Sequence, residues 1–382
     1  MLEPSYGSVL TCCAFSSLLM IFIWLAVRDY KFILQTGTSV LFISIILIIL
    51  RLFVPFNFIF SWDIYSEKIV PTLLTVFYWR IFSIKIMDYL IAIFIVVAII
   101  RLLVYFRRLS AFRKLKKISL PLLDQNINQI LLDILQEHGC KKQIPIYCIP
   151  SIETPAIAGL IHPIIILPKT EYSNQQLQFI LEHELQHYFH HDLWLKFFCE
   201  IMVCLYWWNP LSYIIRKQLK NVLEYDNDMQ ITKEMSAHQQ LDYANTLLKT
   251  VAPKKVPAGL PTMHFRENDP SCIKMRLRLL INPEDVEHRK IFQWIYIGAV
   301  SFVLLVSVCF IIEPRSIPSE VEETTFEEPT KKNTFFIERS DQKGYDMYVN
   351  NKLCGRLDDL KLFEGYKVYK TKKEVPQYEK IK

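Results

Sequence analysis

The segment with the clearest chemical potential is His183-Glu184-Leu185-Gln186-His187, in which two histidines stand four residues apart with a carboxylate beside the first. Residues four apart lie one above the other on a helix, so His183 and His187 would face the same side and could share a metal ion. Zinc (Zn2+) accepts neutral imidazole nitrogens, and three protein ligands leave its fourth position open for water. Glu184 could then take a proton from that water and pass it to a leaving amine.

The setting of this pattern adds to its weight. Nine histidines in 382 residues would produce the pattern by chance in about one or two such chains in a hundred. Ser173 followed by Gln176 is typical of a capping box, and Ile180 and Leu181 follow at helical spacing. We therefore predict a helix over residues 174–192 that carries a metal-binding pair. The alternative is an ordinary amphipathic helix with surface histidines.

A third metal ligand must come from elsewhere in the chain. A helix that continued the site itself would need a Gly six residues and a His ten residues after the first His, but those positions hold Phe and Leu. We expect His190 and His191, in the last helical turn, to be solvated rather than to bind metal. Further along, Glu224 and Asp228 lie one helical turn apart. The Glu could supply the third ligand while the Asp accepts a hydrogen bond from a ligating histidine.

With these residues the chain resembles the BlaR/MecR-type antirepressor metallopeptidases, integral-membrane gluzincins that act as bacterial sensor-transducers. The resemblance covers residues 1–315, in motif order and in membrane layout. The family often has Ala-Cys-Asp at positions 226–228, where this chain has Asp-Asn-Asp, and its best-known members end in a penicillin-binding sensor domain. We expect that domain, and hence β-lactam sensing, to be absent here. The matching segments are residues 183–187 with Asp192 after them, Trp207–Leu211, Glu224–Asp228, Thr154–Gly159 and Ile164–Pro168.

The resemblance implies roles for individual residues. Zinc would be held by His183, His187 and Glu224, with Glu184 as general base and then acid, and Asp228 would orient a ligand histidine. Small gluzincins also place an antiparallel edge strand over the cleft, where it pairs with the extended substrate backbone. In this chain, the strand that binds substrate would consist of Ala156, Ile157, Ala158 and Gly159. The alternative is that these residues form only a buried core strand.

Long apolar segments set the class of the protein. Hydrophobic residues make up 52% of the chain and aromatic residues 13%, which is rich for a soluble protein. The net charge of +6 could suggest nucleic acid as a partner, but the basic residues cluster beside apolar runs, which is how membrane orientation is encoded. We therefore expect a lipid bilayer as partner and no direct contact with nucleic acid. Four segments are long enough to span, at about 8–27, 33–53, 88–106 and 291–312.

The flanking charges predict one topology. Arg107, Arg108 and further basic residues up to Lys117 directly follow the third segment, and the positive-inside rule places that end in the cytoplasm. An acidic tract follows the fourth segment. We thus expect a multi-pass protein of the bacterial cell membrane with both termini outside. Its expected parts are a three-helix transmembrane region (1–106), a cytoplasmic zinc metallopeptidase domain (107–290), a fourth transmembrane helix (291–312) and an extracytoplasmic linker with a small β-rich or partly disordered tail (313–382).

The predicted fold class is therefore an α-helical membrane protein with four transmembrane helices and a cytoplasmic α+β gluzincin-like domain. Residues 193–215 are nearly as apolar as the four spans, yet a single crossing would place His187 and Glu224 on opposite sides of the membrane. This segment must be either a core helix or one that dips into the bilayer and returns. Short strands are expected in the tail at 334–339, 344–349, 352–357 and 366–370.

These expectations combine into a membrane-bound zinc endopeptidase and sensor-transducer. From the resemblance, an extracellular signal would activate cleavage of a cytoplasmic transcriptional repressor, with self-cleavage as a further reaction. The alternatives are an HtpX-type membrane quality-control metalloprotease, a site-two-type intramembrane protease, which the polar histidine helix disfavours, and a non-catalytic zinc-binding receptor. Glu184 argues against the receptor, because a structural zinc site has no use for an acid there. The sequence leaves the oligomeric state open, a homodimer included.

Overall fold

The structure is a computed structural model of the whole chain. It forms two compact units, residues 1–315 and 316–382, each described by itself below. The structure describes residues 6–55, 61–66, 77, 80–81, 84–118, 124–149, 154–251, 270–281, 289–314, 334–338, 344–349, 352–357, 360, 363, 365–370 and 374–375.

The first unit contains a group of long apolar helices. Among the described residues, three helices are long and apolar enough to cross a membrane, and a bent pair makes a fourth if it is one span. The exposed apolar surface suits lipid rather than water, most clearly in the helix that begins at Ile86, where only 6% of the apolar stretch is buried. The helices are α1 (Tyr6–Ala26), α5 (Ile86–Ile118), α12 (Arg289–Cys309) and the pair α2 (Tyr30–Thr36) and α3 (Thr38–Phe53).

The second expected span is bent. One spanning segment was expected over about 33–53, and in the structure this region holds two helices, α2 and α3, that meet at an angle of 88°. The break is at Gly37, whose φ of +84° is a conformation that glycine adopts without strain. Further along, the buried Arg51 donates from Nε and Nη2 to the Oγ and carbonyl oxygen of Ser307, at 3.1 and 2.8 Å. This charged side chain therefore ties α3 to α12.

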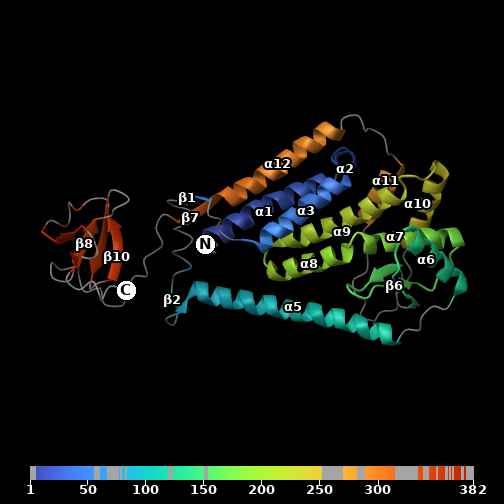
Figure 1. Cartoon of the computed structure of the whole chain (residues 1–382), viewed down its shortest axis with the longest axis horizontal. Helices are drawn as coiled ribbons and strands as arrows, with labels where there is room; N and C mark the ends of the chain where they lie inside the picture. Colours follow the sequence, from blue (N-terminus) through green and yellow to red (C-terminus); the bar gives the residue numbers. More distant parts are fainter. Residues whose placement is uncertain are drawn as a thin grey trace. The chain divides into compact units, whose positions relative to one another are not determined.

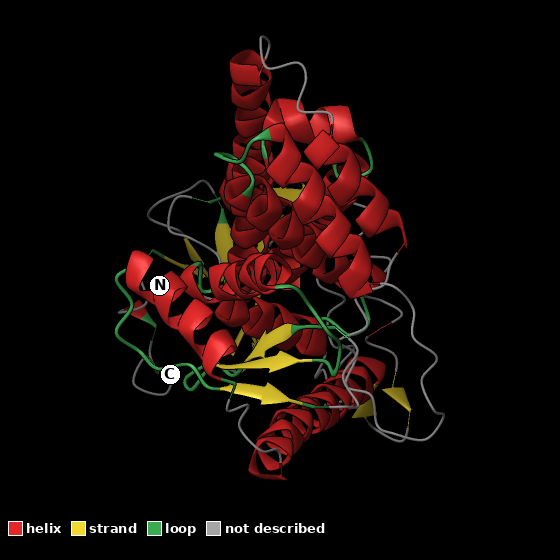
Figure 2. Ribbon diagram, turned by 90° about the vertical axis from the view of Figure 1, so that its right-hand side faces the viewer, coloured by secondary structure: helices red, strands yellow, loops and turns green. Residues whose placement is uncertain are grey.

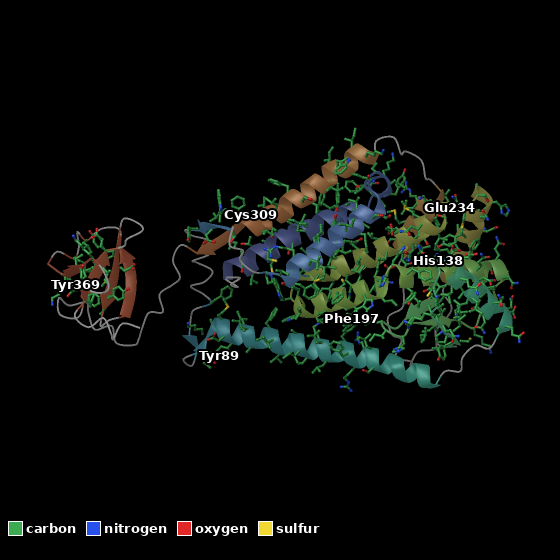
Figure 3. All side chains as sticks on the ribbon, viewed as in Figure 1. Tyr89, His138, Phe197, Glu234, Cys309 and Tyr369 are labelled. Carbon is green, nitrogen blue, oxygen red and sulfur yellow. The ribbon has the colours of Figure 1, made fainter. Side chains whose placement is uncertain are left out.

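In Figure 1, α12 and α5 lie along opposite edges of the helices of this unit, with α1 and α3 between them. Tyr89, near the start of α5, and Cys309, at the end of α12, lie at the end of the unit opposite to His138 and Glu234 (Figure 3). Two short pairings accompany them: β1 (Trp62–Ser66) runs parallel to β7 (Phe310–Pro314), and β2 (Arg80–Ile81) is antiparallel to β3 (Ile84–Lys85).

The apolar segment after the histidine helix is a helical hairpin. It consists of α8 (Asp192–Leu205) and the first part of α9 (Pro210–Ile231), and α9 packs against both α1 and α3. Asn209 caps α9 through Leu211 N, and its side-chain amide donates to Ser17 Oγ on α1 at 3.1 Å. Tyr206 Oη donates to the carbonyl oxygen of Leu52, near the end of α3, at 2.7 Å. Because α9 runs back along α8, the segment does not separate His187 from Glu224.

A small sheet lies beside the histidine helix (Figure 2). Its order is β4-β6-β5, with β4 parallel and β5 antiparallel to the central β6. All four residues of β6 are buried, as expected for a central strand covered on both faces. The sheet packs with two helices around one apolar core that includes Ile165, Leu181 and Leu185, each fully buried. The elements are α6 (Gln125–Glu137), β4 (Ile146–Cys148), β5 (Ala156–Ala158), β6 (Ile164–Leu167) and α7 (Asn174–Phe189).

Two further helices close the other side of the site. They are α10 (Ala237–Val251) and α11 (Pro270–Ile281). A separate core joins α7 to them through Phe179, Tyr243 and Leu280. Helix α11 also packs against α9 and α2. Helices α7 and α9 are therefore enclosed between the sheet on one side and this helix pair on the other.

The second unit is a four-stranded sheet in the order β10-β9-β8-β11. Strands occupy each of the four tail segments in which they were expected, and Phe335 stacks on Tyr348 between neighbouring strands, with ring centroids 5.2 Å apart. The strands are β8 (Thr334–Glu338), β9 (Tyr345–Val349), β10 (Lys352–Leu357) and β11 (Lys367–Tyr369).

Candidate active site

Helix α7 begins where its sequence indicates and ends earlier than expected. Ser173 Oγ accepts from Gln176 N while the Gln176 side chain accepts from Ser173 N, a complete capping box. The helix was expected to reach residue 192 but ends at Phe189. His191 takes a left-handed φ of +61°, which turns the chain directly into α8. This early turn brings Asp192 back toward the helix it follows.

Three side chains from two helices converge at one point. His183 and His187 from α7 and Glu224 from α9 each offer a ligand atom, and these atoms lie within 4.8 Å of one another. His183 Nε2 is 3.2 Å from Glu224 Oε2, and His187 Nε2 is 3.2 Å from Glu224 Oε1. The structure thus brings together all three residues expected to hold the metal.

The donor set fits a catalytic zinc ion. Glu224 Oε1 is buried and has no hydrogen-bond partner in the described part of the chain, although the His187 ring is close to it. A buried carboxylate oxygen without a partner is costly unless something else engages it. Two imidazole nitrogens and one carboxylate oxygen are the ligands of a zinc site that keeps a fourth position open.

The first histidine is oriented through a tyrosine. Tyr243 Oη donates to Asp228 Oδ1 at 2.6 Å and lies 2.9 Å from His183 Nδ1. Burial and the neighbouring Asp228 charge raise the pKa of Tyr243 well above its usual 10.0, so the phenol keeps its proton. Since that proton goes to Asp228, the tyrosine oxygen accepts from His183 Nδ1–H, and Nε2 retains the lone pair that a metal needs. Asp228 itself lies 3.4 Å from His183 Nδ1.

The second histidine has a carboxylate partner of its own. His187 Nδ1 lies 2.6 Å from Asp192 Oδ2, and the Asp192 side chain is fully buried. The Asn227 amide also contacts His187 Nδ1 and lies 3.2 Å from His190 Nδ1. A carboxylate at Nδ1 fixes the ring and raises its basicity as a ligand through Nε2.

A buried arginine joins the two carboxylates of α9. Arg276 from α11 donates from Nε and Nη2 to Asp228 at 2.6 and 2.8 Å, and its Nη1 lies 2.9 Å from Glu224 Oε2. Burial alone would raise the pKa of Glu224, but the Arg276 charge, together with both histidines, holds it well below its usual 4.5. Glu224 is therefore ionised at neutral pH and ready to bind a cation.

Glu184 faces the edge strand of the sheet. Its Oε2 accepts from the backbone N–H of Ile157 on β5 at 2.7 Å. In a strand, the N–H and C=O of one residue point the same way, so Ile157 directs both away from β6 and toward the site. Ala156 and Ala158 flank it and pair with Ile166 and Ile164, while Gly159 follows with a φ of +99°. A Cβ at Gly159 would come within 2.4 Å of the carbonyl oxygen of His162, so only glycine fits this turn.

The expectation about the helix end holds in part. His191 is exposed, and neither His190 nor His191 belongs to the group that could hold a metal. His190 is only partly solvated, because it is half-buried with Nδ1 on Asn227 and Nε2 on Gln186 at 3.1 Å. Sequence reasoning gave no role to three further residues of the site, Asp192, Tyr243 and Arg276. Asp192 stood in the matched segment after the histidines, and its buried position beside them could have been inferred. The other two come from distant helices whose sequences carry no local signal.

Comparison with known proteins agrees with this geometry. Residues 77–280, which contain the three convergent side chains and the elements around them, match the family described as BlaR1 peptidase M56. The chain belongs to this family. It is accordingly a member of a metallopeptidase family, and its apolar helices are those of a multi-pass membrane protein.

Curated relatives lie among regulatory proteins. The chain is 28% identical to the regulatory protein BlaR1 of Bacillus licheniformis over 163 residues, which cover 41% of this chain and 27% of the relative. It is 28% identical to the methicillin resistance mecR1 protein of Staphylococcus aureus (strain Mu50 / ATCC 700699) over 153 residues, 39% and 26% of the two chains. The regulatory protein BlaR1 of Staphylococcus aureus is 26% identical over 221 residues, 56% and 37%. The matches thus span between 26% and 37% of each relative's length.

Proposed function

We propose that this protein is a zinc endopeptidase of the membrane that cleaves a cytoplasmic transcriptional repressor in response to an extracellular signal. The observation that carries the proposal is the convergence of His183, His187 and Glu224 next to Glu184. Each histidine is backed by a buried carboxylate system, Asp228 behind the first and Asp192 behind the second. A surface cluster without function would have no reason to orient both rings in this way.

The chain's own groups divide the work of peptide hydrolysis. Bound zinc would supply Lewis-acid polarisation of the scissile carbonyl and of the attacking water. Glu184 takes the proton from water as general base and delivers it to the leaving amine as general acid. The open edge of β5 offers the Ile157 carbonyl oxygen to an extended substrate backbone, which would bind as an added strand. Asp228, Tyr243 and Asp192 hold the histidine rings in the required tautomer.

The membrane layout supports the direction of signalling. Basic residues directly follow the apolar part of α5, and those that the structure describes with their side chains, Arg107 and Arg108, are exposed. By the positive-inside rule, this end and the peptidase region after it face the cytoplasm, and the unit from residue 316 onward lies outside. The relatives' names, which include the word regulatory, favour a dedicated repressor over general quality control as the substrate.

The decisive experiment compares wild type with Glu184→Ala and Glu224→Ala. Zinc content and cleavage of a candidate repressor are measured for each purified protein. We expect Glu184→Ala to keep zinc and lose cleavage, because it removes only the proton carrier, and Glu224→Ala to lose both. Normal zinc binding by Glu224→Ala would show that the third ligand is wrong. If Glu184→Ala cleaved the repressor as fast as the wild type, the enzymatic role would be refuted. If the wild-type protein cleaved misfolded membrane proteins but spared the repressor, the quality-control alternative would be favoured.

A further inference from the structure

The two oxygens of Glu224 have different surroundings. Oε2 is held by Arg276 Nη1 at 2.9 Å and lies 3.2 Å from His183 Nε2. Oε1 has no hydrogen-bond partner among the described residues and faces His187 Nε2. The carboxylate thus has one oxygen engaged by the protein and one left for another partner.

All three nitrogens of the Arg276 guanidinium contact a carboxylate. Nε and Nη2 form a two-point contact with Asp228, which leaves Nη1 for Glu224. All three side chains are buried, with exposed fractions of 8%, 1% and 4% for Arg276, Asp228 and Glu224. The planar fork fixes both the distance and the direction of Nη1, which a lysine could not do.

We infer that Arg276 is a positioning residue that restricts Glu224 to metal coordination through Oε1 alone. This inference rests on the proposed function, since it assumes a metal held by His183, His187 and Glu224. A carboxylate free to rotate could offer both oxygens to the ion and fill the position that a reacting group needs. With Oε2 on Arg276, that position stays open.

The placement of Arg276 also makes the metal site depend on a neighbouring helix. Two residues further on, Arg278 lies over the ring of Tyr30 on α2, 3.8 Å from its centroid. Helix α11 therefore contacts α9 through Arg276 and the first residue of α2 through Arg278. A shift of α11 would move Nη1 and release Oε2.

The test uses the full-length protein in detergent, loaded with zinc or with cobalt(II). X-ray absorption at the zinc edge gives the total number and mean distance of the ligand atoms, and the visible spectrum of the cobalt form distinguishes four from five ligands, since four-coordinate cobalt absorbs more strongly. For wild type we expect four ligand atoms at zinc and a four-coordinate cobalt spectrum. A five-coordinate site in wild type would overturn the inference without any variant.

The variant that isolates the geometry is Arg276→Lys, which keeps a positive charge beside the buried carboxylates but loses the fork. We expect a weaker, five-coordinate cobalt spectrum and about 10–100-fold weaker zinc binding, the range seen when a partner of a metal ligand is changed. The matched control is Arg278→Lys on the same helix, which should leave the spectrum unchanged. A folded Arg276→Lys with the wild-type spectrum would refute the role of Arg276. If Arg276→Lys does not fold, the wild-type measurement decides. A wild-type spectrum in Glu224→Ala would instead refute the proposed metal site.

Discussion

At the scale of single residues, Asp192 provides the sharpest test of the site beyond its ligands. Its carboxylate is fully buried and contacts His187 Nδ1 at 2.6 Å. Asp192→Asn keeps the shape but removes the charge that supports the ring, so we expect about 10–100-fold weaker zinc binding. Competition with a chelator of known affinity measures this. The control is Asp133→Asn, whose exposed carboxylate contacts only Gln129 among the interactions seen. Equal zinc affinities in the two variants would show that Asp192 does not support His187 as a ligand and serves only at the start of α8.

The sequence predicted the ligands better than the groups behind them. Helical spacing alone placed His183 and His187 on one face. The pattern Glu-x-x-x-Asp carries no signal alone, but its place after the histidine helix pointed to Glu224 and Asp228. Tyr243 and Arg276 could not be found this way, because each reaches the site from a helix whose position is set by apolar packing around Phe179 and Leu280. The spacing of residues within one segment does not predict which distant segment it packs against.

At the scale of elements, α9 connects the site to the apolar helices through Asp226. This residue lies between Glu224 and Asp228, and its Oδ1 accepts from Thr38 Oγ1 at the start of α3, at 2.6 Å. Thr38→Val should cost about 1.5–3 kcal/mol, the range for hydrogen bonds to charged groups. We expect the variant to have a lower Tm in detergent, measured from the change in tryptophan fluorescence on heating.

The matched control for this variant lies two residues earlier. Thr36 is fully buried, and its hydroxyl has no hydrogen-bond partner in the described part of the chain. Thr36→Val should therefore leave the Tm unchanged or raise it, because the same change of shape removes no bond. If both variants lowered the Tm equally, the effect would come from packing of the side chains, and the link through Asp226 would contribute nothing.

Element boundaries show where sequence reasoning reaches its limit. The capping box at Ser173 and Gln176 is a local feature and was predicted correctly. The bend at Gly37 and the early turn at His191 depend on single backbone conformations that the apolar pattern around them does not reveal. For residues 193–215, the requirement that His187 and Glu224 share a metal excluded a single crossing, and the structure shows a hairpin of α8 and α9.

At the scale of the whole molecule, the hairpin and the topology can be tested together. Trp208, near the tip, is 48% exposed and apolar, while neighbouring Tyr206 bonds to Leu52 near the far end of α3. Since α3 belongs to the bent pair that could form one span, we expect the tip to lie within the bilayer. His162, by contrast, is exposed on the loop after β5, within the region expected to face the cytoplasm.

Membrane-impermeant maleimide should therefore distinguish Trp208→Cys from His162→Cys. We expect His162→Cys to react in inside-out vesicles and not in intact cells, because charged reagent reaches it only from the cytoplasmic side. Trp208→Cys should not react above the parent chain in inside-out vesicles, since the surrounding helices and lipid exclude the reagent. Labelling of His162→Cys in intact cells would reverse the orientation inferred from the basic residues after α5. Labelling of Trp208→Cys in inside-out vesicles, equal to that of His162→Cys, would place the hairpin in water and leave its exposed aromatic residues to be covered by another protein rather than by lipid.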